Sequence, residues 1–302
     1  MSFYLLLTSM RAADRLIIVN NIVDNHSDRN VDHNVNTSVA VLGLGEAGSA
    51  IAEDLIRAGV RVRGWDPAPR GELNLESIPL AESDHTAVAG ADVVLSVNTA
   101  SVATKVAERV APLLNSDQLY ADLNTASPQL KADVARTVEG VGASFVDVAL
   151  MTPVVGRGIR TPCLVSGSGA AKFVEMFRPL GMPIRLVDAR AGSAAERKLL
   201  RSVFMKGIAA AVIEGVEAAS AAGCSGWLRE EIISVFEEAD SRLFERLIDG
   251  SYRHATRRVD EMMAAGDLLR TLGVEPRVSV AAAGWLEELA TRSSRLARGD
   301  GA

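Results

Sequence analysis

Lys198 is the residue whose position most directly indicates chemistry. At about 100° per residue along a helix, it is the only charge on a stripe made of Ala194, Lys198, Ser202, Met205, Ala209, Val212, Ile213 and Val216. A lysine on such a stripe either extends its amine to solvent or lies in a cleft. In a cleft, desolvation lowers the pKa of the ammonium and makes proton exchange near neutral pH feasible. The pattern therefore predicts a proton-transfer group, with a solvated lysine as the alternative.

A second chemical signature is the glycine cluster Gly43-Leu44-Gly45-Glu46-Ala47-Gly48, which lies between two apolar runs. Gly43 permits a tight turn, Gly45 lets backbone approach a pyrophosphate, and Gly48 lets a helix pack closely on a strand. The amides that begin such a helix favour phosphate. The cluster predicts a dinucleotide-binding turn, and the alternative is a glycine-rich turn that binds nothing.

Asp66 ends the next apolar run, twenty-three residues beyond Gly43. A carboxylate there accepts hydrogen bonds from an adenosine ribose and repels a 2′-phosphate. NAD is therefore the predicted cofactor. NADP stays possible, because Arg61, Arg63 and Arg70 are close in sequence and one of them could reach a 2′-phosphate.

The elements that would position these residues form two blocks. Short apolar runs that alternate with helical stretches predict a Rossmann-type, doubly wound parallel α/β sheet over residues 37–190. Its expected strands are Val39–Leu42, Val60–Trp65, Asp92–Val97, Leu119–Leu123, Phe145–Leu150, Leu164–Ser166 and Ile184–Val187. Residues 191–298 predict an all-helical domain with helices over 193–222, Ser225–Asp249, His254–Leu272 and Val278–Ala297.

Composition excludes several classes of protein. The net charge of −6 over 302 residues argues against a broad surface for nucleic acid or anionic membrane. Cys163 and Cys224 lie far apart without a metal-ligand pattern, so the sequence predicts no metal site and a reducing, cytoplasmic setting. Residues 1–36 lack helical or strand periodicity and contain a polar run. We expect a disordered extension there rather than a signal peptide.

These motifs resemble the β-hydroxyacid dehydrogenases, which include 3-hydroxyisobutyrate and 6-phosphogluconate dehydrogenases. Besides the glycine cluster, Asp122-Leu-Asn124-Thr125-Ala-Ser-Pro128 is similar to the family's cofactor-side loop D-x-S-T-x-x-P, with Asn124 in place of serine. The segment from Gly192 to Ser202 is similar to the one that carries the catalytic lysine. The resemblance implies that Lys198 is the general acid/base, that Ser202 replaces a catalytic-site amide, and that Asn98, Thr99, Asn124 and Thr125 contact the cofactor.

The substrate loop departs from the family. Where members carry D-x-x-V-S-G-G, this chain has Asp147-Val-Ala-Leu150-Met151-Thr152-Pro153. Met151 and Thr152 are therefore the expected substrate contacts, and the familiar small hydroxyacids are in doubt. Arg157 and Arg160 follow as candidate partners for a substrate carboxylate, or else as solvated side chains on an exposed loop.

The predicted function is hydride transfer between a nicotinamide and a hydroxyacid or related carbonyl compound. Reduction of a C=N bond, as in imine reductases, is one alternative, although those enzymes usually lack the lysine. A dinucleotide-binding protein without turnover is another. The expected partners are an anionic small-molecule substrate and a second copy of the chain in a homodimer built on the helical domain, which resembles that of phosphogluconate-dehydrogenase-like proteins. No nucleic acid or membrane is expected.

Overall fold

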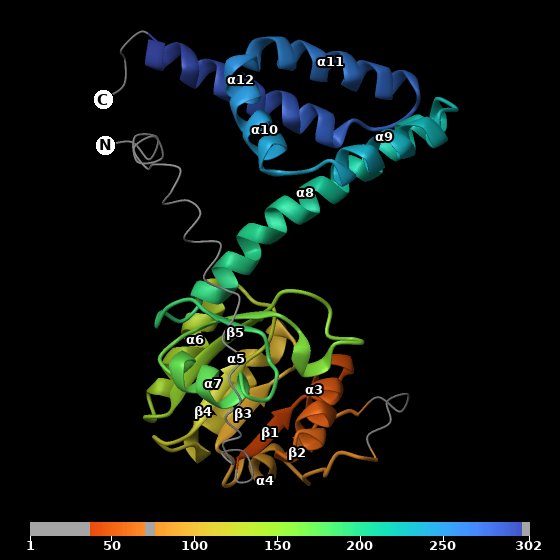
Figure 1. The fold of residues 1–302 in the computed structure, drawn as a ribbon. Helices are drawn as coiled ribbons and strands as arrows, with labels where there is room; N and C mark the ends of the chain where they lie inside the picture. Colours follow the sequence, from red (N-terminus) through yellow and green to blue (C-terminus); the bar gives the residue numbers. More distant parts are fainter. Residues whose placement is uncertain (1–36, 70–75, 298–302) are drawn as a thin grey trace, which may run out of the picture.

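The computed structural model describes residues 37–69 and 76–297, so the extension expected over residues 1–36 and Arg70 lie outside the described residues. A seven-stranded sheet in the order β2-β1-β3-β4-β5-β6-β7 forms the centre of the lower part of the molecule (Figure 1). Its strands are β1 Ser38–Leu42, β2 Arg61–Trp65, β3 Val93–Ser96, β4 Leu119–Asp122, β5 Ser144–Leu150, β6 Cys163–Ser166 and β7 Ile184–Leu186. The predicted α/β fold class is confirmed.

Helices cover both faces of this sheet. Along β1, Val39 and Val41 point into one apolar cluster with α3 (Glu46–Arg57) and α7 (Ala170–Phe177). Ala40 and Leu42 point into the opposite cluster with α4 (Asp84–Val88), α5 (Ala100–Val110) and α6 (Pro128–Glu139). A strand buried on both faces reads as a continuous apolar run, which is why the sequence signal was strong.

The sheet departs from a parallel arrangement at one pair of strands. β5 and β6 are antiparallel, with Asp147 opposite Ser166 and Leu150 opposite Cys163, whereas the other neighbouring strands are parallel. The connection between them, residues 151–162, contains only the short 3-10 turn η2 (Gly158–Arg160). A parallel neighbour usually requires a crossover that contains an α-helix, and this link of twelve residues contains none, which fits the reversal of the chain.

The helical part consists of α8 (Ser193–Ala221), α9 (Ser225–Glu237), α10 (Ser241–Arg253), α11 (Ala255–Thr271) and α12 (Arg277–Ala297). The single helix predicted over Ser225–Asp249 is wrong, because the chain breaks between α9 and α10. Asp240 causes the break: its carboxylate accepts hydrogen bonds from the amides of Arg242 and Leu243 at 2.8 and 3.1 Å and so caps α10.

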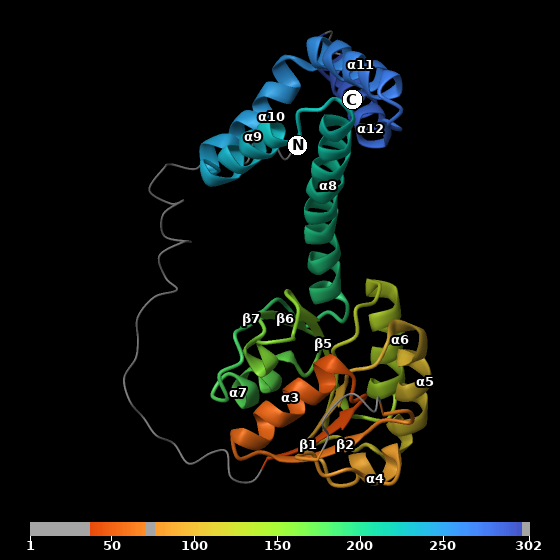
Figure 2. The same cartoon turned by 90° about the vertical axis from the view of Figure 1, so that its right-hand side faces the viewer.

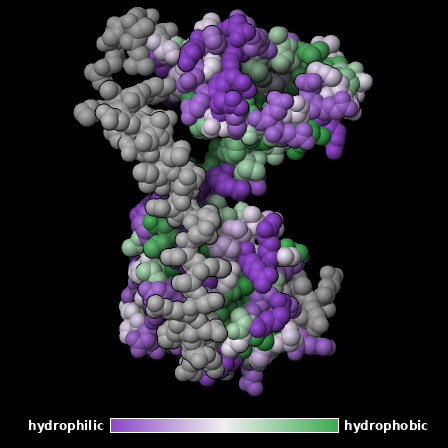
Figure 3. Space-filling view, in the orientation of Figure 1, coloured by the Kyte–Doolittle hydropathy of each residue, from purple (hydrophilic) through white to green (hydrophobic). Residues whose placement is uncertain are grey.

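Helix α8 joins the two parts and stands largely apart from both along its middle (Figure 2). Its first turn packs on β5, β6 and α6, and its far end contacts α9 and α12. The carboxylate of Glu214 accepts hydrogen bonds from the amides of Val278 and Ser279, which ties α8 to the start of α12. The molecule narrows between the two parts (Figure 3). No helix among the described residues has the length and apolarity needed to cross a bilayer.

Candidate active site

The glycine turn runs from the end of β1 into α3, and each of its three positions is occupied by glycine for a different structural reason. Gly43 has φ +103°, and a Cβ there would lie 2.4 Å from the carbonyl oxygen of Val97. A Cβ on Gly48 would lie 1.9 Å from the carbonyl oxygen of Gly43, so these two residues allow the turn and the close helix packing. A Cβ on Gly45 would meet nothing within 4 Å. Gly45 therefore borders open space instead of packed protein.

That space is a cavity of about 670 Å³ along the carboxyl ends of the parallel strands. It contains nine of the eleven residues predicted to bind the cofactor: Gly43, Gly45, Glu46, Ala47, Asp66, Asn98, Thr99, Asn124 and Thr125. Leu44 is buried in the core and Gly48 packs on Gly43, so neither residue lines the cavity. Sequence reasoning missed Trp65, Lys105 and Arg109, which also line it.

Asp66 lies at the β2 end of the cavity. Its carboxylate accepts hydrogen bonds from the amides of Leu44 and Ala68, both at 2.8 Å, and so faces the glycine turn. Arg63 donates instead to the carbonyls of Thr86 and Ala89, away from this end. Arg109 pairs with Asp84 and stacks over the ring of Trp65. Of the arginines near Asp66, these two are thus already engaged.

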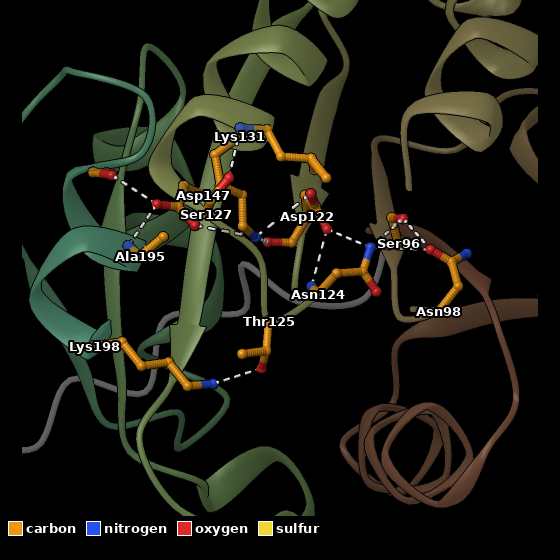
Figure 4. Close-up of polar contacts among 12 residues, drawn as sticks. Ser96, Asn98, Asp122, Asn124, Thr125, Ser127, Lys131, Asp147, Ala195 and Lys198 are labelled. Atoms are coloured by element: carbon orange, nitrogen blue, oxygen red, sulfur yellow. Dashed lines mark hydrogen bonds and ion pairs between the residues drawn. The ribbon is translucent and has the colours of Figure 1, made fainter. Parts of the chain in front are cut away.

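A polar network forms the opposite end of the cavity, at β3 and β4 (Figure 4). The side-chain nitrogen Nδ2 of Asn124 donates to Ser96 Oγ at 3.2 Å, to Asn98 Oδ1 at 3.0 Å and to Asp122 Oδ1 at 2.5 Å. Asn124 Oδ1 is buried and has no hydrogen-bond partner among the described residues. The cavity thus has an unpaired acceptor, Asn124 Oδ1, at one end and the Asp66 carboxylate at the other. Between them lie the first amides of α3, which no side chain caps. This arrangement fits an extended dinucleotide.

Lys198 reaches this second end from α8. Its Nζ donates to Thr125 Oγ1 at 2.9 Å (Figure 4). The side chain is half-buried, and its pKa lies below the ordinary lysine value, because burial disfavours the ammonium and the Lys131 cation adds repulsion, while Asp147 opposes both. Ser202, one turn further, is also half-buried. The structure thus brings Lys198 next to a residue that lines the dinucleotide cavity.

The predicted substrate loop lies beside α8. Nη1 of Arg201 donates to the carbonyl of Met151 at 3.4 Å, which places Met151 within reach of the Lys198 helix. The Thr152 hydroxyl is buried without a hydrogen-bond partner among the described residues. Arg201, which the sequence analysis did not select, therefore lies near the predicted substrate loop, three positions after Lys198 on α8.

Arg157 and Arg160 are not brought to this site. They line another cavity of about 560 Å³ on the outer side of α3, together with Glu53, Asp54 and Arg57. The amide of Ile159 donates to the Asp54 carboxylate at 2.8 Å, which fastens the loop to α3. The loop therefore turns its arginines towards α3, and a role for them in binding the substrate has no support from this arrangement.

Family models match both parts of the chain. Residues 38–171 match the NAD binding domain of 6-phosphogluconate dehydrogenase, and residues 219–289 match a domain of unknown function. Together with the fold and the cavity, the first of these matches defines the class of this part of the chain: it is an NAD(P)-binding domain of the kind found in 6-phosphogluconate dehydrogenase.

Two relatives carry the name 3-hydroxyisobutyrate dehydrogenase. The 3-hydroxyisobutyrate dehydrogenase of Pseudomonas aeruginosa is 29% identical over 199 residues, which are 60% of this chain and 65% of that protein. A probable 3-hydroxyisobutyrate dehydrogenase of Mycobacterium tuberculosis is 30% identical over 168 residues, 53% of this chain and 57% of that protein. The aligned part therefore spans somewhat more than half of each relative. The resemblance to the β-hydroxyacid dehydrogenases is confirmed.

Solved structures share the fold over most of the chain. A conserved hypothetical protein from Sinorhizobium meliloti is 29% identical, with a TM-score of 0.57 over 83% of this chain and 87% of that one. A conserved protein described as similar to 3-hydroxyacid dehydrogenases is 25% identical, with a TM-score of 0.56 over 85% and 99%. The Streptomyces aurantiacus imine reductase is 18% identical, with a TM-score of 0.71 over 85% and 95%, and shows the fold alone.

Proposed function

We propose that this chain oxidises a hydroxyl group, or reduces the corresponding carbonyl, of an anionic small molecule, with Lys198 as the acid/base group. The observation that carries the proposal is the 2.9 Å hydrogen bond from Lys198 Nζ to Thr125 Oγ1, at the end of the cavity opposite Asp66. Because the Asp66 carboxylate, the expected partner of the adenosine ribose, lies at the β2 end, the nicotinamide would lie at the β4 end. Lys198 would therefore meet the substrate oxygen beside the reacting carbon.

In the proposed reaction, Lys198 moves the proton, and the neighbouring residues bind the substrate. A nicotinamide held at the Asn124 and Thr125 end of the cavity would supply the hydride chemistry at the carbinol or carbonyl carbon. In oxidation, neutral Lys198 Nζ takes the hydroxyl proton, and in reduction the ammonium gives it back. Burial supports this role, because it lowers the pKa of the Lys198 amine and so makes release of its proton easier than from an exposed lysine. Ser202 is assigned a hydrogen bond to the substrate, and Met151 and Thr152 form the wall beside it.

A substrate screen tests the function. Hydroxyacids, semialdehydes and cyclic imines are offered with NADH, NADPH and their oxidised forms, and turnover is followed at the nicotinamide absorbance. We expect turnover of hydroxyacids or semialdehydes. Turnover of the imines alone would favour C=N reduction. Binding without turnover of any compound would favour the non-catalytic alternative, which the altered substrate loop supports.

Arg201 is our candidate for the substrate anion. Its single hydrogen bond, to Met151, is long at 3.4 Å, and no other acceptor contacts it among the described residues. Arg201→Gln should raise KM for an anionic substrate by about 10–100-fold with little change in kcat, since a hydrogen bond to a charged group contributes about 1.5–3 kcal/mol. Arg197→Gln, an exposed change on the same helix, is the control. Equal KM values for both variants would remove Arg201 from the site.

Asp66 is our candidate for cofactor choice. Asp66→Ser should weaken NAD binding and improve NADP binding together, because it removes both the ribose acceptor and the charge that repels a 2′-phosphate. Asp66→Asn controls for the hydrogen bond to Leu44, as an amide oxygen can still accept it. Dissociation constants from calorimetry measure both effects. A wild-type chain that already prefers NADPH would overturn this assignment.

A homodimer is the proposed assembly. Large apolar side chains are exposed on α8 and on the helices beyond it: Val203 (74%), Phe204 (60%), Ile213 (58%), Trp227 (61%), Phe244 (58%) and Trp285 (63%). These side chains lie on helices that contact one another, α8 with α9 and α12, and α10 with α12, and apolar surface gathered in one region is typical of an interface. Light scattering should report twice the chain mass of 32.0 kDa at micromolar concentration. Phe204→Glu should shift the mass towards that of one chain, and a wild-type monomer would contradict the proposal.

A further inference from the structure

Lys131 is a second buried lysine, which the proposed reaction does not use. It lies on α6 with 1% of its surface exposed. Its Nζ donates to the carbonyl oxygen of Asp122 at 2.7 Å and forms ion pairs with Asp147 Oδ1 at 3.1 Å and Asp122 Oδ2 at 3.5 Å. Burying an ammonium is costly unless it is paired and hydrogen-bonded, so this arrangement depends on all three contacts.

One carboxylate connects Lys131 to the helix that carries Lys198. Asp147 Oδ2 accepts a hydrogen bond from the Ala195 amide at 2.9 Å, and the neighbouring Ser166 Oγ accepts one from the Ala194 amide at 3.0 Å. These two acceptors satisfy the otherwise orphaned amides in the first turn of α8. Lys198 follows Ala194 and Ala195 by four and three positions and so lies on the same face one turn later.

The other carboxylate connects Lys131 to the loop that Lys198 contacts. Asp122 ends β4, and its Oδ1 accepts hydrogen bonds from the Asn124 amide at 2.9 Å and from the Asn124 side chain. The next residue is Thr125, whose hydroxyl accepts the hydrogen bond from Lys198. Figure 4 shows Lys131 between these two aspartates, with the pair formed by Lys198 and Thr125 below them.

We propose that Lys131 is a positioning residue: it holds the Thr125 loop and the first turn of α8 together, and so sets where Lys198 Nζ lies in the site. This inference rests on the proposed role of Lys198. The close packing of the two helix starts supports it, since a Cβ on Gly192 would lie 2.6 Å from the carbonyl oxygen of Pro128, the first residue of α6. Small movements of α6 are thereby passed to α8.

The same arrangement makes the role measurable without turnover. The charged groups that act on Lys198 are Lys131 from α6, Asp147 from β5 and Lys206 from α8 itself. The two lysines favour the neutral amine of Lys198, and Asp147 favours the ammonium. Removing the Lys131 charge leaves only the weaker repulsion from Lys206 against the attraction of Asp147, and should therefore raise the pKa of Lys198.

The test is amine labelling of the full chain with acetic anhydride over a pH series, with the extent at Lys198 read by mass spectrometry. In Lys131→Met we expect the labelling midpoint of Lys198 to rise by about one pH unit, which is the usual effect of a nearby charge. Lys172→Met is the charge control: Lys172 also donates at 2.7 Å to a backbone carbonyl, that of Asp117 before β4. Val134→Ala is the packing control, as it loosens the same buried face of α6.

A second variant removes the charge imbalance, so that the fold is retained if Lys131→Met alone is too unstable. In Lys131→Met/Asp147→Asn the midpoint should return to near the wild-type value. Hydrogen exchange over residues 123–127 and 193–198 should nevertheless be faster than in the wild type, because the tether is gone. A midpoint that stays unchanged in Lys131→Met, or rises equally in Val134→Ala, would overturn the inference, as would wild-type exchange in the double variant. Full activity of Lys198→Ala would instead remove the proposed reaction and leave these results standing.

Discussion

Lys198→Ala is expected to lower kcat by about 10²–10⁴-fold, the range for loss of an acid/base group, while NADH affinity stays nearly unchanged. The amine contacts Thr125 at the rim of the cavity and not the glycine turn, so binding of the dinucleotide does not depend on it. Stopped-flow measurement of turnover with a substrate from the screen, beside calorimetry with NADH, separates the two quantities.

Two further variants identify what Lys198 does. Lys198→Arg should be almost as slow as the alanine variant, because a guanidinium does not release a proton near neutral pH. Lys206→Ala is the matched control, since Lys206 is exposed and is the weakest of the influences on the pKa of Lys198. A nearly wild-type kcat in Lys198→Ala would contradict the proposed role of Lys198 and would favour C=N reduction or a non-catalytic function.

The pH dependence has a fixed sign. In reduction Lys198 must be protonated, so kcat/KM should fall as pH rises through its lowered pKa, and in oxidation it should rise through the same value. The limb should be absent from the residual activity of Lys198→Ala. A limb that persists in that variant would belong to another group.

Local patterns predicted the parts of the fold and site that depend on short-range chemistry. The glycine cluster, the strand before it and the acid after the next strand lie within thirty residues, and all of them border or support one cavity. The antiparallel direction of β6 was missed, because an apolar run indicates that a strand is buried but not in which direction it runs. The break at Asp240 was missed, because an aspartate within a helical pattern can cap a helix or simply lie on its exposed face.

Long-range placement explains the other misses. Arg157 and Arg160 were candidates for a substrate carboxylate because of their charge, with solvated side chains as the alternative. The loop that carries them is hydrogen-bonded to Asp54, a hundred residues earlier. Lys131 could have been found. It shares an apolar face with Val134, Ala135 and Val138, the same pattern that selected Lys198. Its two partners, Asp122 and Asp147, lie opposite each other on the neighbouring strands β4 and β5. The sequence alone does not show that these two strands are neighbours.

Binding of NAD(H) over the glycine turn predicts an equally large effect at Gly45. Valine at this position should abolish NADH binding while leaving the fold intact. The reason is that Gly45 has φ −72°, which any residue adopts, and that its missing side chain faces only the open cavity. The added methyl groups would occupy the place where backbone amides must approach the pyrophosphate.

Gly45 is the informative glycine because its neighbours would fail for another reason. A side chain on Gly43 or Gly48 would collide with backbone at 2.4 or 1.9 Å and disturb the turn itself. Gly45→Ala should give a smaller loss than valine, and Gly226→Val, which also meets nothing within 4 Å but lies on α9, should leave NADH binding unchanged. Circular dichroism and the melting temperature verify that each variant is folded. Undiminished NADH affinity in a folded Gly45→Val chain would show that the pyrophosphate binds elsewhere, and the assignment of the whole cavity would fall with it.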